Sequence, residues 1–304
     1  MLPNLTFLKR AVLVLIGFEL LGPGVTGGAW IGRRNQEDIP SGQAEAEQQP
    51  QLQEFLDLKC YRIEQGRPLN QTLALRHLNP VLQGAPDERV VVREPQQLCV
   101  PVAKEGQRPP DNLLRFIQYI DLKCYRIEPG SPLQRTLVLR HLNPVLRQRG
   151  APAEEVVVLE PLQLCVPVAK AGINIPPDVV QLVQYIDLKC YRIVQGQSLG
   201  QTLRLQHLNP LFQRLPEETV VVQQPQKLCV PVAKEGIIPP PDVLQLIQVI
   251  DQKCYDIQRG TPLNQTVTLQ HLNPVLRRRL SPSERVTLRE PQQLCVPVLK
   301  APAQ

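Results

Sequence analysis

The sequence predicts a mainly β protein with short helices, built from four tandem disulfide-stapled, β-rich repeats behind a signal peptide and a disordered tether. Three observations lead to this class. A unit of about 65 residues occurs four times, all eight cysteines fall inside these units, and alternating apolar and polar segments recur in each of them. A unit of this size buries little apolar surface, so each repeat is expected to be a small domain that needs a covalent link. The repeats are assigned to residues 54–108, 109–173, 174–237 and 238–304.

The N-terminal region has the pattern of a secretory signal peptide over residues 1–29. Lys9 and Arg10 precede an apolar stretch at 11–21, and small residues at 27–29 offer a cleavage site. The stretch is short for a membrane span, although an uncleaved anchor is an alternative. Residues 30–53 are rich in Gln, Glu, Arg and Gly, which predicts a disordered tether. We therefore expect a secreted, periplasmic or cell-envelope protein that does not associate with the membrane after signal cleavage.

The cysteines are predicted to form one disulfide within each repeat. Export and an even cysteine count favour disulfides, and the separations are 39 or 41 residues within repeats and 25 between them. The alternative pairing across repeat boundaries would leave Cys60 and Cys295 without partners. Closing a loop of this length should contribute roughly 4 kcal/mol to stability. The predicted pairs are Cys60–Cys99, Cys124–Cys165, Cys190–Cys229 and Cys254–Cys295.

Each later repeat is expected to begin with a short helix. Two prolines and an aspartate precede about eight mostly apolar residues, and aspartate is common at helix N-termini. In the third repeat Gln181, Gln184 and Asp187 recur every third residue, which predicts a helix with one polar edge, although a strand is an alternative. The segments start at Asp111, Asp178 and Asp242 and end at Asp121, Asp187 and Asp251.

Two strands follow in the first half of each repeat. The first, at 59–63, is rich in strand-forming residues and ends near Gly66. The second, at 72–77, alternates apolar and mostly polar residues up to His77, which predicts a half-buried strand.

The second half of each repeat contains a loop and two further strands. A third strand at 89–92 is expected to end at Glu94-Pro95, and a fourth at 98–102 contains an internal proline. Because proline cannot donate to a ladder, this proline predicts an edge position. The length variation among repeats predicts surface loops at 83–87, 147–153, 214–216 and 277–283.

The two cysteine motifs support a family resemblance. In the first repeat they are Cys60-Tyr61-Arg62-Ile63 and the segment Leu-Cys-Val-Pro-Val-Ala-Lys that ends at Lys104. They resemble the units of an uncharacterised domain family found in tandem in secreted bacterial proteins, and the resemblance covers nearly all of residues 55–304. Members of that family tend to have an Asp-Gln-Phe-Gly-like turn where this chain has His77-Leu78-Asn79-Pro80. The resemblance implies a fold and a location, and it implies no activity.

Recurring polar residues provide few candidates for chemistry. One histidine per repeat falls in phase with the buried face of the second strand, so a structural hydrogen bond to a loop carbonyl is expected, with metal binding or catalysis as alternatives. The aspartates before the first strand are interpreted as turn or cap residues, and the tyrosines after the first cysteine as packing over the disulfide. No serine recurs and no closely spaced cysteine pair for zinc occurs, so we expect no enzyme, cofactor or metal site. The residues are His77, His141, His207 and His271; Asp57, Asp121, Asp187 and Asp251; and Tyr61, Tyr125, Tyr191 and Tyr255.

Composition narrows the function further. The net charge of +6 is spread over the repeats and aromatic residues make up only 4%, which does not match a nucleic-acid binder. The leading hypothesis is a non-enzymatic exported monomer, acting as a spacer or a multivalent surface for an extracellular or envelope protein or polymer. Its contacts would be the loops after Asn79, Asn143, Asn209 and Asn273. The alternatives are inhibition of secreted hydrolases through these loops, and a histidine-based metal binder or enzyme.

Overall fold

A computed structural model describes residues 51–82, 84–279 and 283–303. The predicted signal peptide (1–29) and most of the predicted tether (30–50) lie outside the described residues. The end of the predicted tether was assigned wrongly, because helix α1 (Leu52–Phe55) begins there and Leu52 is buried in the core. Residues 51–304 form one compact unit that is mainly β, as predicted.

The same three strands recur in each repeat. The first strands are β1 (Asp57–Glu64), β4 (Asp121–Glu128), β7 (Leu188–Val194) and β10 (Gln252–Gln258). The second strands are β2 (Gln71–His77), β5 (Arg135–His141), β8 (Gln201–His207) and β11 (Gln265–His271). The long strands are β3 (Glu88–Lys104), β6 (Glu154–Lys170), β9 (Glu218–Lys234) and β12 (Glu284–Pro302). The other helices are α2 (Asp111–Ile117), α4 (Pro177–Val183) and α5 (Pro241–Ile247) before the first strands, and η2 (Pro80–Leu82), α3 (Pro144–Gln148) and α6 (Pro274–Arg279) after the second strands.

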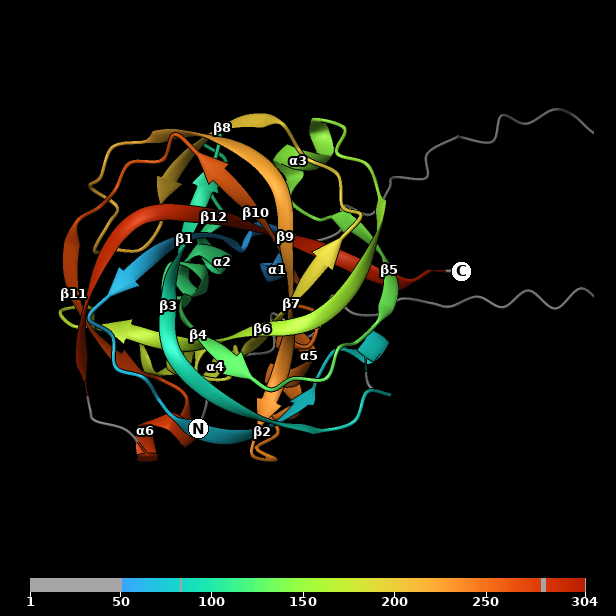
Figure 1. Ribbon diagram of the computed structural model, residues 1–304. Coiled ribbons are helices and arrows are strands. Elements are labelled where there is room, and N and C mark those ends of the chain that lie inside the picture. The colour runs from blue at the N-terminus through green and yellow to red at the C-terminus, as the bar shows by residue number, and fades with distance from the viewer. Residues whose placement is uncertain (1–50, 83, 280–282, 304) are drawn as a thin grey trace, which may run out of the picture. The chain divides into compact units, whose positions relative to one another are not determined.

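The first and long strands form a closed antiparallel barrel (Figure 1). Each first strand pairs with the long strand of its own repeat and with the long strand of the preceding repeat. The ring closes because β1 pairs with β12, from the other end of the described chain. The order around the barrel is β1, β3, β4, β6, β7, β9, β10, β12 and β1 again.

The second strands connect opposite repeats. β2 pairs with the first half of β3 in its own repeat and with the end of β9 in the third repeat. β8 makes the reciprocal connection, since it pairs with β9 and with the end of β3. β5 and β11 join the second and fourth repeats in the same way. Because every repeat shares its strands with other repeats, none of them packs as the separate small domain that the sequence suggested.

The predicted third and fourth strands are one long strand. β3 continues through Pro95, where its register against β4 shifts, so a bulge accommodates the proline that was expected to end the strand. The second proline, Pro101, is not at a sheet edge, because it is paired with β1. On the other side of β3 the neighbour changes there, from β4 at Cys99 to β8 at Val102. The missing N–H of Pro101 therefore falls where one neighbouring strand ends and the next begins.

Gly66 fixes the position of this bulge. A Cβ atom on Gly66 would lie 2.4 Å from Cγ of Pro95, which is far inside contact distance. The equivalent glycines Gly130, Gly196 and Gly260 meet prolines in the same way. The glycine predicted to end the first strand is thus required by close packing against the long strand.

The predicted helices are confirmed, with a different role for their aspartates. In α4 the proline Pro176 occupies the N-cap position, and Asp178 lies in the first turn without a capping hydrogen bond. Gln181 and Gln184 are at least partly exposed, as the predicted polar edge requires, but Asp187 is buried.

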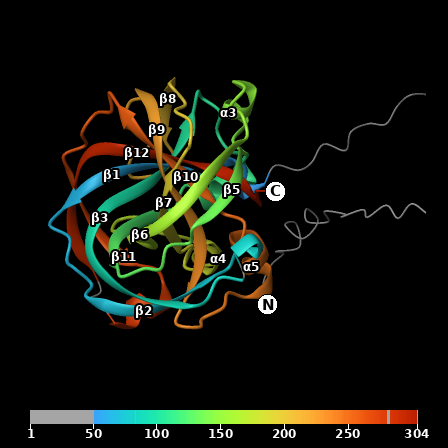
Figure 2. The same cartoon turned by 45° about the vertical axis from the view of Figure 1, so that its right-hand side comes forward.

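Side chains alternate between the inside and the outside of the barrel. Leu58, Cys60 and Cys99 belong to the inner core, together with apolar residues of α1, α2, α4 and α5, which lie within the ring of strands (Figures 1 and 2). Their neighbours Tyr61 and Leu98 point outward into one of four smaller cores formed with the second strands. The helices fill one end of the barrel, and polar side chains occupy the other end.

Candidate functional site

The four histidines are buried and hydrogen-bonded to tyrosines. His207 Nε2 lies 3.0 Å from the hydroxyl of Tyr61, which belongs to the opposite repeat. Burial, followed by nearby lysine charges, lowers the pKa of each histidine to about 3, so the rings stay neutral. The predicted structural hydrogen bond is present, but its partner is a tyrosine hydroxyl and not a loop carbonyl. The other pairs are Tyr125–His271, Tyr191–His77 and Tyr255–His141.

The tyrosines do not pack over the disulfides, as the sequence suggested. Adjacent residues of a strand face opposite sides, so Cys60 points into the barrel and Tyr61 points out of it. Lys59 Nζ lies 4.8 Å from the centre of the Tyr61 ring and forms an ion pair with Glu218 of the opposite repeat.

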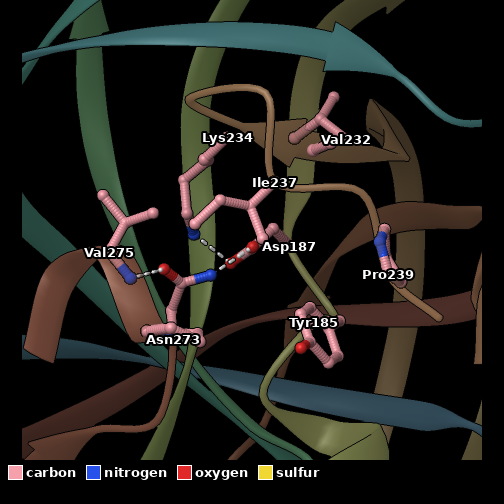
Figure 3. Close-up of a pocket in the computed structure, with 10 residues that line it drawn as sticks. Tyr185, Asp187, Val232, Lys234, Ile237, Pro239, Asn273 and Val275 are labelled. Atoms are coloured by element: carbon pink, nitrogen blue, oxygen red, sulfur yellow. Dashed lines mark hydrogen bonds and ion pairs between the residues drawn. The ribbon is translucent and has the colours of Figure 1, made fainter.

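The aspartates before the first strands are buried ion-pair residues, which corrects their interpretation as turn or cap residues. Asp57 accepts hydrogen bonds from Lys104 Nζ at 2.5 Å and from Asn143 Nδ2 at 2.6 Å. Lys104 ends the same repeat, whereas Asn143 belongs to the next one. Figure 3 shows the equivalent arrangement around Asp187. The other three groups are Asp121 with Lys170 and Asn209, Asp187 with Lys234 and Asn273, and Asp251 with Lys300 and Asn79.

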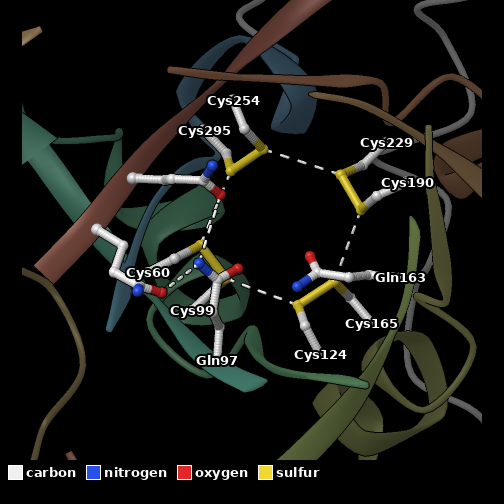
Figure 4. The surroundings of a disulfide bond; sticks show 12 residues. Cys60, Gln97, Cys99, Cys124, Gln163, Cys165, Cys190, Cys229, Cys254 and Cys295 are labelled. Carbon is white, nitrogen blue, oxygen red and sulfur yellow. Dashed lines mark hydrogen bonds between the residues drawn. A yellow bond between two sulfur atoms is a disulfide. The ribbon is translucent and has the colours of Figure 1, made fainter. Parts of the chain in front are cut away.

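The disulfides form a ring inside the barrel (Figure 4). All four bonds lie within repeats, as predicted, and join cysteines directly opposite each other on paired strands. Each bond also lies 3.7–3.8 Å, sulfur to sulfur, from the bonds of the two neighbouring repeats. Four disulfides fit an oxidising environment outside the cytoplasm.

The ring of disulfides shows that the number of cysteines does not by itself select pairing within repeats. Cys60 and Cys295, which pairing across the boundaries was expected to leave unpaired, lie 3.7 Å apart because β1 and β12 are neighbours. Pairing across all four boundaries would therefore also use every cysteine. Direct opposition of the cysteines within each repeat, and not elimination, accounts for the observed pairing.

A polar cavity of about 600 Å³ lies at the end of the barrel away from the helices. We call it the axial cup. Its volume lies in the range of small-molecule sites, and side chains from all four repeats line it. The lining residues are Arg62, Ile63, Gln96, Gln97, Arg126, Leu162, Gln163, Arg192, Gln226, Lys227, Gln292 and Gln293.

Lys227 is the distinctive residue of the axial cup. It is 5% exposed, and its Nζ donates hydrogen bonds to Oε1 of Gln163 at 2.6 Å and to Oε1 of Gln97 at 3.1 Å. Burial lowers the pKa of Lys227 to about 7, although the negative charge of Asp256 partly opposes this. Every other buried lysine in the described part of the chain has an ion pair with a carboxylate, and Lys227 has none there.

The amides around Lys227 are held in place by one another. Gln97 and Gln163, whose oxygens accept from Lys227, donate through Nε2 to other glutamines of the cup. On the other side, Gln226 and Gln293 donate to the two carboxylate oxygens of Asp256 at 2.6 and 3.2 Å. These contacts hold the amide groups of the cup in defined orientations.

The arginines of the axial cup are already paired. Each of the three guanidinium groups contacts both oxygens of a glutamate, which compensates most of its charge. The pairs are Arg62–Glu290, Arg126–Glu94 and Arg192–Glu160. Among the described residues, Lys227 is therefore the cation of the cup whose charge no carboxylate contacts.

Sequence reasoning missed this site, although a signal for it existed. Lys227 occupies the position that is Gln97 in the first repeat, and Asp256 occupies the position that is Arg62. Comparing the repeats position by position would have marked both substitutions. It could not have shown that they are near each other, because that follows from pairing of β9 with β10, in which Lys227 lies opposite Cys254.

The predicted surface loops are only partly loops. Arg147 belongs to α3 and Arg277 belongs to α6, while residues 83 and 280–282 lie outside the described residues. A buried apolar residue anchors each segment in an outer core: Leu82, Leu146, Phe212 and Leu276. Partner binding and hydrolase inhibition through these segments stay predictions.

Two kinds of feature are absent from the described part of the chain. Within it, no group of three or more His, Cys, Asp and Glu side chains is arranged to hold a metal ion. None of its helices has the length and apolar character needed to cross a bilayer.

Comparisons of the chain with family models, with curated proteins and with solved structures found no match. The resemblance of the cysteine motifs to tandem units of secreted bacterial proteins therefore stays a prediction.

Proposed function

We propose that this chain is a non-enzymatic exported binding protein that holds a small oxyanion in the axial cup at Lys227. One observation carries this proposal: a buried lysine, which has no carboxylate partner within the described part of the chain, is held by two amide oxygens beside a cavity of about 600 Å³. A buried unpaired cation is costly, and an anionic ligand would compensate it. Lys227 alone can supply this attraction, since the arginines are already paired.

The rest of the cup favours a polar ligand. Glutamine side chains contribute both donors and acceptors, and the residues that line the cup include no aromatic ring for stacking. A carboxylate or phosphate group on a small hydroxylated molecule would bond to Lys227 and to the amides together. The lining amides and paired guanidinium groups position a ligand and do not exchange protons with it near neutral pH.

Location and oligomeric state are part of the same proposal. The disulfides and the leader sequence support a secreted, periplasmic or envelope location. The barrel closes within one chain, so its strands need no second subunit to complete the sheet, which supports a monomer. The intertwined repeats favour one central site over four equivalent weak sites.

Titration of the oxidised protein with three anions tests the proposal. Inorganic phosphate, citrate and glucuronate would be compared with neutral glucose by calorimetry at about pH 6 and about pH 8.5, on either side of the Lys227 pKa of about 7. We expect at least one anion to bind, and to bind more tightly at the lower pH because Lys227 is then protonated.

Two variants make the test specific. Lys227→Gln gives the third repeat the residue of the other three and should abolish anion binding. Asp256→Asn keeps the cation and should retain it. Equal binding by wild type and Lys227→Gln, or no anion binding stronger than that of glucose, would refute the proposal.

A further inference from the structure

The end of the barrel opposite the axial cup carries four copies of one buried group. Each copy combines a lysine and an aspartate of one repeat with an asparagine of the next repeat. In the first copy Lys104 is 1%, Asp57 2% and Asn143 4% exposed. Burying four identical charged groups is an unfavourable way to stabilise a fold, because the free energy needed to desolvate an ion pair can exceed the energy of its Coulomb attraction.

The atoms of each group are placed as two reactants and an activating donor. Lys104 Nζ contacts Asp57 Oδ1 at 2.5 Å, and a nitrogen in such contact lies within about 3–3.5 Å of the carboxyl carbon, the range of near-attack geometries. Asn143 Nδ2 donates to the other oxygen at 2.6 Å. A donor at that oxygen would stabilise the negative charge that develops there during attack on the carbon.

The asparagine is itself held in orientation. In the third copy Asn273 Oδ1 accepts a hydrogen bond from the backbone N–H of Val275 at 3.0 Å, so its Nδ2 faces Asp187 (Figure 3). The equivalent contact of Asn143 with Val145 caps α3. The donor is thus in place before any reaction begins.

Burial favours the uncharged forms of both reactants. It raises the pKa of Asp57 to about 6, against the opposing influence of Lys104, and it lowers the pKa of Lys104. The shifts have the same directions in the other three groups. A neutral amine is a nucleophile and a protonated carboxyl group has a hydroxyl that can leave as water.

A small cavity adjoins the third group. Its volume is about 10 Å³, close to the space that one water molecule needs, and Asp187, Lys234 and Asn273 line it together with apolar residues such as Val232 and Ile237 (Figure 3). The cavity offers a place for one released water, and its apolar wall limits access of bulk water that would reverse a condensation.

We propose that Lys234 Nζ and the Asp187 carboxyl group condense to an intramolecular isopeptide bond, and that the other three Lys–Asp pairs do the same. The Nζ lone pair attacks Cγ of the aspartic acid, and a C–N bond forms. A proton passes from Nζ to the departing hydroxyl, the C–O bond breaks, and one water leaves. No oxidant, reductant or co-reactant is needed. Each repeat would then contain an isopeptide bond in addition to its disulfide. Formation of these bonds does not depend on ligand binding in the axial cup.

Mass spectrometry of the folded full-length protein tests the proposal. After denaturation, complete reduction and alkylation, we expect the chain to be lighter than its fully alkylated sequence by the mass of one water per bond, up to four. Proteolysis should give a branched peptide that joins the segments of Asp187 and Lys234, and trypsin should fail to cleave after Lys234.

Controls separate the bond from other causes of the same mass loss. An aspartate succinimide also loses water, but it gives no branched peptide. Lys234→Arg keeps a cation near Asp187 and should restore one water of mass, whereas Lys227→Gln, in the axial cup, should restore none. Asn273→Ala should slow bond formation during refolding. An intact mass equal to that of the fully alkylated sequence, or a linear wild-type peptide ending at Lys234, would refute the isopeptide bond, whether or not the axial cup binds anions.

Discussion

The two ends of the barrel differ in how their buried charges are compensated. At the helix end every repeat has the same aspartate, lysine and asparagine, and each lysine is paired. In the axial cup three repeats have a glutamine where the third has Lys227, and three have an arginine where the fourth has Asp256. Charges needed to build a repeat recur in every repeat, so a charge that occurs once is better explained by a function of the whole barrel. This difference predicts opposite effects of mutation at the two ends.

The largest effect is expected where a repeated pair is broken. Asp187→Ala leaves Lys234 buried without a carboxylate, and such an uncompensated charge should destabilise the fold by about 3–5 kcal/mol. Denaturant unfolding of the oxidised protein measures this. The matched change in the cup, Asp256→Ala, should cost about 1 kcal/mol, because Asp256 is only partly buried and its partners are neutral amides. Equal losses at both ends would contradict the comparison.

The histidines should make the protein sensitive to acid. Their pKa in the folded state is about 3, whereas unfolded histidines titrate near 6.5, so below about pH 6.5 the unfolded chain binds more protons. The free energy of unfolding should therefore fall with decreasing pH, by about 1.4 kcal/mol per pH unit for each histidine. In chains whose Asp57 has not condensed with Lys104, protonation of Asp57 in the folded state, where its pKa is about 6, acts in the opposite direction.

A variant isolates the histidine contribution from that of the aspartates. His207→Gln retains a side chain that can bond to Tyr61 and removes one titrating ring. Between about pH 6 and pH 4.5 its unfolding free energy should depend less steeply on pH than that of the wild type, by about 1.4 kcal/mol per unit. An unchanged slope would show that His207 is protonated in the folded protein.

The smallest effect, and the one of opposite sign, is expected in the axial cup. The pKa of Lys227 is about 7 in the folded protein, whereas an unfolded lysine has a pKa of about 10.4. Burial of its charge therefore lowers the free energy of unfolding below about pH 10.4, and this destabilisation reaches its full size below about pH 7. Lys227→Gln should stabilise the protein by about 1–2 kcal/mol at neutral pH, with the gain shrinking as the pH rises toward 10. Thermal unfolding over this pH range measures it. Loss of stability in this variant would place Lys227 among the structural charges.

Some residues were interpretable from the sequence because their signal is local. The alternation that ends at His77 predicted β2 within one residue, and the Pro-Pro-Asp segments predicted α2, α4 and α5. The predictions made from Pro95 and Pro101 were wrong, because a proline can be accommodated by a bulge or by a change of neighbouring strand. Neither arrangement can be recognised without knowing the partner strands. Asp187, Lys234 and Asn273 recur visibly in the sequence. Pairing of β7 with β9 within the third repeat brings Asp187 to Lys234, whereas only contact between repeats brings Asn273 to them.

By itself, the sequence determined the repeat, the helix before the first strand and the first two strands of the repeat, because the signals for these elements act over a few residues. It indicated disulfides, but the direct opposition of cysteines on paired strands selected the pairing within repeats. The tertiary structure alone decided which repeats exchange second strands, that β1 closes on β12 and that Lys227 reaches a shared cavity. The physical reason is that four similar repeats offer similar partners for every strand. Their sequences therefore do not determine which strands pair. The observed pairing is the one that closes the barrel and so satisfies the backbone hydrogen bonds of all eight of its strands.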